Sequence, residues 1–258
     1  MIETPRSDIH DAAAWHDVVE RMIEAGAAVA AAAKVDSGNP AQITGLAALF
    51  RALQHIQGVR LLVKAGHVVE ARIITRSLFE GMFMTADLAA DGAAAFRALV
   101  DDHAASKRSR GEQIIQLNDT FSAAKADTAR EHLRLLTAKI GKGRMMRPKE
   151  IAARTQMAGA YMFYSQLSND SAHPSLNALE RHVVRPEDGG LISEMTAAPQ
   201  LDSAEDAETL GWACMAMLGT LVSVRDLTNA FAAEPTIAAA SDAYMALTAA
   251  PGPVGEEE

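Results

Sequence analysis

Four charged residues, Glu70, Arg72, Arg76 and Glu80, stand in a largely apolar stretch, and the last two are the first candidates for chemistry. The stretch HVVEARIITRSLFEGMFMTADLAAD contains Arg76 and Glu80, beside apolar residues such as Val69 and Phe83. The i,i+4 spacing places both charges on one face of a helix, and unpaired buried charge is costly. Two interpretations stay open: a structural ion pair, or an arginine held ready for an anion with Glu80 orienting it.

A second candidate is the polar run YMFYSQLSNDSAHPS. Tyr161, Tyr164, Ser168 and Asn169 recur in it at helical spacing, and His173 stands at the expected helix end, just before a proline. A helix C-terminus carries partial negative charge, which favours a protonated imidazole. His173 is therefore interpreted either as a general acid or as a simple helix cap.

A third candidate is the basic segment KIGKGRMMRPK in an acidic chain. Its Lys142, Arg144 and Arg147 stand near two glycines, so the segment is expected to be a flexible loop. Such a loop binds phosphate groups, including those of RNA, or is simply a solvated connection between helices.

Several classes of site are excluded. The chain has one cysteine, Cys214, so no disulfide framework and no cysteine metal cluster can form within it. No phosphate-binding loop, zinc-protease motif, nucleophile elbow or di-iron pattern is present, and we expect no metal and no cofactor. The net charge of −9 does not indicate a bulk nucleic-acid binder, although it allows a local basic patch.

The elements that must position these residues are helices. Hydrophobic residues make up 49% of the 258-residue chain and aromatic residues only 5%, and the apolar positions recur at helical spacing. Asn39-Pro40 is a helix start signal and Gly66 a stop signal. Residues 67–91 and 203–232 are so apolar that we expect them to be central helices, compatible with a homodimer interface.

The remaining segments predict further helices and one hairpin. A helix is expected from Ala93 through Phe121, another from Pro148 to near Ala172, and a small β-hairpin near 183–192. The prediction is all-α: a single-domain, mostly antiparallel helical bundle over residues 1–249, followed by a disordered acidic tail, 250–258.

No targeting segment is visible, and the apolar stretch from Leu210 to Val224 is too short to span a bilayer. We therefore expect a cytoplasmic protein that has no membrane partner.

Two of the candidate segments together resemble a bacterial family of unknown function. GHVVEARIITRSLFEGMF resembles its pattern G-x-x-x-E-A-x-x-x-x-R-S-L-x-E, carried by Gly66, Glu70, Ala71, Arg76, Ser77, Leu78 and Glu80. YSQLSNDSAHPS resembles its second signature, a helix ending in His-Pro-Ser, carried by Tyr164, Leu167, Ser168, His173 and Ser175. The resemblance implies no activity. Glu70, a charged residue of the same apolar stretch as Arg76, is a further candidate binding residue.

The end of the second segment, NDSAH, is also similar to the Arg-polar-x-x-x-His motif of the HEPN superfamily. These proteins are helical bundles, and many are dimeric, metal-independent ribonucleases of toxin–antitoxin and defence systems. Asn169 and His173 match the polar residue and the histidine, but Ser168 occupies the arginine position. By this resemblance, the phosphate contact would have to come from Arg76.

Two functions stay open. The first is a non-catalytic module that binds a partner protein or a small ligand in a polar groove around Arg76, Glu80 and His173. The alternative is a HEPN-like ribonuclease or phage-defence effector that acts on RNA as a homodimer. There His173 would transfer the proton, Arg76 would stabilise the phosphorane charge and Asn169 would position the substrate.

Overall fold

The computed structural model of the chain describes residues 12–117, 123–141, 143–172, 175–185, 194–202 and 204–249. Within these ranges the regular elements are helices, apart from one two-stranded antiparallel hairpin. The predicted all-α helical bundle is confirmed.

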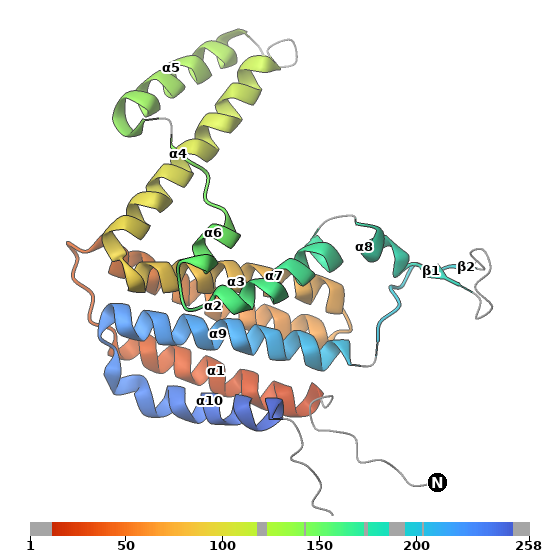
Figure 1. Cartoon of the computed structure of the whole chain (residues 1–258). Coiled ribbons are helices and arrows are strands. Elements are labelled where there is room, and N and C mark those ends of the chain that lie inside the picture. Colours follow the sequence, from red (N-terminus) through yellow and green to blue (C-terminus); the bar gives the residue numbers. More distant parts are fainter. Residues whose placement is uncertain are drawn as a thin grey trace, which may run out of the picture.

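Five long helices form the body of the molecule (Figure 1). They are α1 (Ala12–Ala32), α2 (Pro40–Lys64), α3 (Val68–Ala90), α9 (Glu205–Thr228) and α10 (Glu234–Thr248). Helix α9 packs against each of the other four, and α3 packs against both α9 and α2. The two segments that the sequence predicts to be central are thus the core of the bundle.

Close packing between α3 and α9 depends on small residues. A Cβ atom added at Gly219 of α9 would lie 2.5 Å from the sulfur of Met82 in α3. The glycine therefore lets two largely apolar helices approach closely, and both contribute fully buried side chains, such as Phe79, Met82 and Leu221.

The predicted boundaries of α2 are correct. The side chain of Asn39 accepts hydrogen bonds from the backbone N–H groups of Ala41 and Gln42, and Pro40 occupies the first helical position. These contacts satisfy donors that a helix N-terminus leaves unpaired. The chain turns after the helix at Gly66, whose φ of 78° lies in the left-handed region that glycine adopts without strain.

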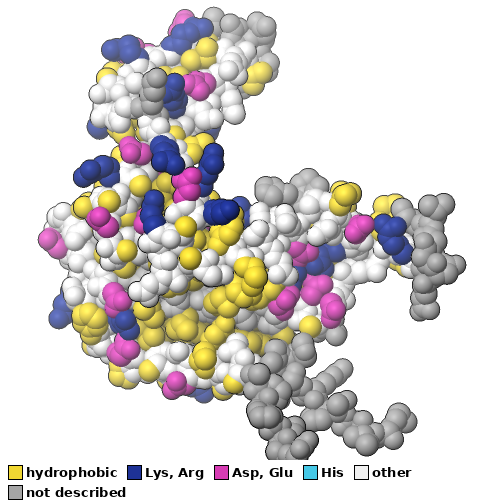
Figure 2. Space-filling view, in the orientation of Figure 1, with side chains coloured by type: hydrophobic (Ala, Val, Ile, Leu, Met, Phe, Trp, Pro, Cys, Tyr) yellow, Lys and Arg dark blue, Asp and Glu magenta, His cyan; other side chains and the backbone are white. Residues whose placement is uncertain are grey.

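Helices α4 (Gly92–Gln116) and α5 (Ala123–Ile140) form a hairpin that projects from the body (Figure 1). We call this hairpin the arm. Helix α5 packs against α4 and has no comparable contact with another described helix. Figure 2 shows Lys and Arg side chains gathered on the arm and at its root. Helix α4 ends at Gln116, and Phe121, where the sequence expectation ended, lies outside the described residues.

The prediction of one continuous helix from Pro148 to Ala172 is wrong. The segment contains α6 (Pro148–Ala153), a 3₁₀ turn (Ala158–Ala160), α7 (Tyr161–Leu167) and a π turn (Ser168–Ala172). The break has a local cause, because the hydroxyl of Thr155 accepts the backbone N–H of Met157 at 3.2 Å and competes with the helical bond. The predicted end near Ala172 is correct.

Beyond the π turn, α8 (Leu176–Glu180) is capped by the hydroxyl of Ser175. Strand β1 (Val183–Val184) pairs with β2 (Glu194–Met195) in the expected hairpin. Residues 186–193, which include the end of the predicted hairpin, lie outside the described residues, as do Ser203 and the predicted acidic tail.

Helix α9 corrects one expectation from the sequence. It has 24 residues, and it is long and apolar enough to cross a membrane by length and composition. However, 72% of its apolar window is buried inside the bundle. The prediction that this segment is too short to span a bilayer was therefore wrong. Its burial is typical of a core helix, as the sequence also indicated.

Candidate functional site

Arg76 and Glu80 of α3 meet Tyr164 of α7 in a three-residue contact that we call the tyrosine bridge. The Arg76 guanidinium donates to the Tyr164 hydroxyl at 2.7 Å, and that hydroxyl donates to Glu80 Oε1 at 3.1 Å. Arg76 also lies 3.1 Å from the same carboxylate oxygen. Arg76 and Glu80 thus form an ion pair within α3, and Tyr164 of α7 bonds to both of its members.

The tyrosine bridge is only partly buried. Tyr164 is buried, whereas the Arg76 and Glu80 side chains are 23% and 40% exposed. The guanidinium carbon lies 4.9 Å from the centroid of the Tyr164 ring, close enough for a cation–π contact. Burial, with Glu80 nearby, raises the pKa of the Tyr164 hydroxyl, so the phenol stays protonated and can keep donating.

Glu80 also borders a cavity of about 270 Å³ between α2 and α3. The polar groups that line it are Arg51, His55 and Ser77, together with Glu80. Burial, with Arg51 nearby, lowers the pKa of His55, so this imidazole is neutral at pH 7. Arg51 is exposed and has no carboxylate partner among the residues that the structure describes. We call this cavity the α2–α3 cleft.

A second charged group lies where α3, the π turn, α8 and the start of α9 come together. Arg72 of α3 is 3% exposed, and its guanidinium binds Asp170, Glu208 and the hydroxyl of Thr209. It also lies 5.1 Å from the centroid of the Trp212 ring. The most deeply buried arginine of the α3 segment is therefore Arg72, one helical turn before Arg76.

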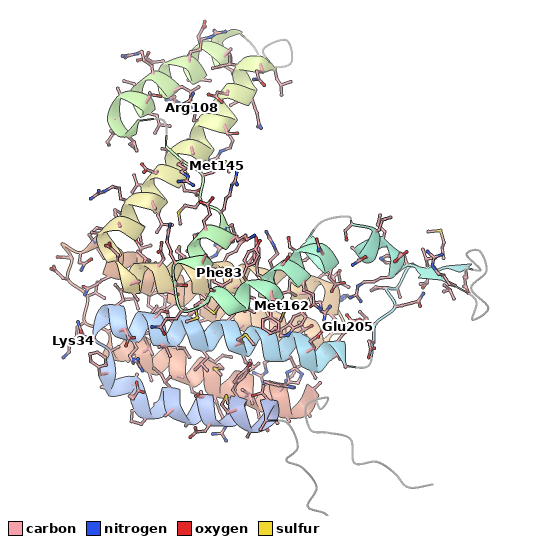
Figure 3. All side chains as sticks on the ribbon, viewed as in Figure 1. Lys34, Phe83, Arg108, Met145, Met162 and Glu205 are labelled. Carbon is pink, nitrogen blue, oxygen red and sulfur yellow. The ribbon has the colours of Figure 1, made fainter. Side chains whose placement is uncertain are left out.

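Arg181, just after α8, completes this group. Its guanidinium donates to Asp170 at 2.7 Å and to Glu205 at 3.0 Å. Figure 3 shows Glu205 at the start of α9, at the end of the body where α8 begins. Two arginines thus face three carboxylates, those of Asp170, Glu205 and Glu208, and we call these five residues the double-arginine cluster. Burial raises the pKa of Glu208, the most exposed of the three.

The other predicted site residues are spread over several surfaces. The ring of Tyr161 lies 5.5 Å from that of Tyr164, so Tyr161 belongs to the tyrosine bridge surroundings. Ser168 is half-buried in the π turn, while Asn169 and Glu70 are exposed and join neither charged group. His173 and Lys142 lie outside the described residues.

Arg144 and Arg147 lie at the root of the arm rather than at the tyrosine bridge. They line a cleft of about 120 Å³ between α4 and α6, which none of the predicted α3 or α7 residues reaches. Arg144 pairs with Glu150 at 2.9 Å, and Arg147 is exposed at the cap position of α6. The structure therefore separates the predicted basic loop from the predicted polar groove.

Two arrangements that support bond-breaking chemistry are missing from the described residues. Among the described contacts no hydrogen bond joins Ser77, His55 and Glu80, as an activated nucleophile would require. In the described part of the chain no group of three His, Cys, Asp or Glu side chains is placed to hold a metal ion. Arg76 is engaged by Glu80 and Tyr164, although its Nε is buried without a hydrogen-bond partner.

Sequence reasoning missed the double-arginine cluster and the basic side of the α2–α3 cleft. Arg72 stands in the same apolar stretch as Arg76 and gives the same signal. Asp170 lies within the polar run between two candidate residues, so it was within reach of the same argument. No local pattern marks Arg51 or His55, because both lie on an ordinary amphipathic helix.

Comparison with models of protein families identifies a family for this chain. The model of a family of unknown function, DUF5677, matches residues 43–191, which is more than half of the chain and includes the tyrosine bridge and all residues that line the α2–α3 cleft. No curated protein and no solved structure matches the chain.

Proposed function

We propose that this chain, which belongs to the DUF5677 family, is a non-catalytic binding module that holds a small polar ligand in the α2–α3 cleft. The observation that carries the proposal is the position of Glu80. Its Oε1 is fixed by Arg76 and Tyr164, and the same side chain lines a cavity whose other wall carries Arg51 and His55. A carboxylate held in this way is preorganised for a ligand, because few of its degrees of freedom remain to be lost on binding.

The groups around the cleft specify the chemistry of the ligand. Glu80 accepts hydrogen bonds from an ammonium or amide group, and the exposed Arg51 favours a carboxylate or another anion. Ser77 and the neutral His55 each offer a donor and an acceptor. At about 270 Å³ the cavity lies just below the usual range for ligand pockets, which suits a small zwitterion of amino-acid size.

Free amino acids are therefore the probe for the first experiment. Isothermal titration calorimetry with the wild-type protein is expected to give saturable binding of at least one of them. Glu80→Gln and Arg51→Ala should each weaken that binding tenfold or more. The matched control is Glu112→Gln, because Arg108–Glu112 is an i,i+4 pair of the same kind on the arm. Absence of binding by every amino acid, or equal loss in the control, would count against the proposal.

A second candidate function is the HEPN-like ribonuclease, and one observation favours it. The segment that leads to His173 ends in a π turn, Ser168–Ala172, and such turns are frequent at functional sites. In this mechanism Arg76 would have to leave Glu80 to reach a phosphate. If His173→Ala leaves cleavage of RNA and toxicity in cells at the wild-type level, the ribonuclease hypothesis is wrong.

A further inference from the structure

The charge of the chain is unevenly distributed. Residues 92–154, which comprise the arm and its root, carry thirteen Lys and Arg against seven Asp and Glu, a net charge of +6. The rest of the chain has a net charge of −15. The protein is therefore acidic as a whole, but the arm and its root are strongly basic.

Part of this positive charge is neutralised within the arm, and part is not. Arg108, Arg130 and Arg134 each pair with an acidic residue three or four positions away. Six exposed cations have no carboxylate partner within the described ranges. They are Arg97, Lys107, Arg110, Lys139, Arg147 and Lys149.

The root of the arm is held in a fixed conformation. Gly143 has a φ of 67°, and a Cβ atom added there would lie 2.3 Å from the carbonyl oxygen of Asp101 in α4. The backbone N–H of Met146 donates to the Asp102 carboxylate at 2.8 Å. Figure 3 shows Met145 at this junction, between the arm and α6. The basic loop is therefore packed onto α4, and the position of Arg147 relative to the arm is defined.

The projection separates the basic arm from the acidic body. At 1.5 Å per residue, the 18 residues of α5 span about 27 Å. The Debye length at physiological ionic strength is about 8 Å. A polyanion bound along the arm is thus screened from most of the body's negative charge, and it experiences mainly the local positive charge (Figure 2).

We propose that the arm is a docking surface for the phosphate backbone of a nucleic-acid duplex. The kind of residue decides between partners. Protein interfaces are enriched in aromatic side chains and depleted in lysine, and residues 104–140 contain one Phe, Phe121, and no Tyr or Trp. Single strands are bound largely by stacking on such rings. On α4 the unpaired cations run from Arg97 to Arg110, about 20 Å at 1.5 Å per residue, which lies within one duplex turn of about 34 Å.

Fluorescence anisotropy with duplex RNA and duplex DNA, at several salt concentrations, tests the proposal. Wild-type protein is expected to bind at least one duplex with an affinity that falls steeply as salt rises. The triple variant Lys107→Ala, Arg110→Ala, Lys139→Ala should bind about tenfold more weakly or worse. Each lost phosphate contact makes the slope of log affinity against log salt less steep by about 0.9 for a DNA duplex. The matched control, Arg21→Ala, Lys34→Ala, Lys64→Ala, removes three exposed cations from the body and should bind as the wild type does.

Several results would overturn the proposal. One is no binding to either duplex at low salt, and another is equal affinity of the wild type and the arm variant. Binding to a single strand alone, or to vesicles of anionic phospholipid but to no duplex, would assign the arm to another partner. The same holds if the arm variant changes the sedimentation of the protein, because the arm would then dock onto the acidic body of a second copy. The α2–α3 cleft plays no part in these measurements, so their outcome does not test the proposal that this cleft binds a small polar ligand.

Discussion

Arg72→Met is expected to destabilise the protein by about 3 kcal/mol, more than any other single charge removal on α3. The native guanidinium binds Asp170, Glu208 and Thr209, and it is 3% exposed. Methionine keeps much of the volume and the packing against Trp212 while removing the charge. The substitution therefore leaves acceptors that have lost their donor, which is the costly way to break a buried network.

The magnitude follows from what remains after the substitution. Removing one partner of a buried ion pair costs about 3–5 kcal/mol. The lower end applies here, because Arg181 still pairs with Asp170 and Glu205, and the Glu208 side chain is 39% exposed and can be hydrated. For a protein of this size, 1 kcal/mol corresponds to roughly 2–4 °C in melting temperature, so a fall of about 6–12 °C is expected.

Urea denaturation followed by far-UV circular dichroism measures the effect. The control is Arg130→Met on the arm, where both members of the Arg130–Asp127 pair are more than half exposed. That variant should lose about 0.5 kcal/mol or less, because exposed ion pairs contribute little. If Arg72→Met loses no more than Arg130→Met, the double-arginine cluster does not hold the π turn and α9 to α3. Adding Glu208→Gln to Arg72→Met should restore part of the lost stability.

Three further outcomes follow from the structure. Because burial raises the pKa of Glu208, its ionisation costs stability as the pH rises above its ordinary value of 4.5. The free energy of unfolding of the wild type, measured in urea relative to Glu208→Gln, should therefore fall as the pH rises from 4 to 7. Gly143→Ala should lower the melting temperature more than Gly141→Ala. Both glycines have a positive φ, which costs alanine about 1–2 kcal/mol. Only at Gly143 would the added Cβ also collide with α4. Burial raises the pKa of the Cys214 thiol, so a thiol reagent should modify it only after denaturation, and rapid labelling of the native protein would contradict this.

The fold could be predicted from the sequence wherever the determinants are local. Asn39 and Pro40 start α2 through contacts within one turn, and Gly66 ends it through its own backbone conformation. The apolar surface of α3 and α9 predicts their central position, since a helix without a polar face must be covered on all sides. The prediction failed between Pro148 and Ala172, where the hydroxyl of Thr155 outweighs the helical periodicity around it.

The candidate site could be predicted only in part, because its partners are distant in the sequence. Arg72 and Arg76 are one turn apart in the same apolar helix, and nothing local distinguishes them. Arg72 is buried because it contacts Asp170 and Thr209, which lie 98 and 137 positions further along the sequence. Arg76 meets Tyr164 instead and stays 23% exposed. A charged residue in an apolar helix therefore predicts that a partner exists, whereas the approach of distant segments decides whether the charge is sealed in or left accessible to a ligand.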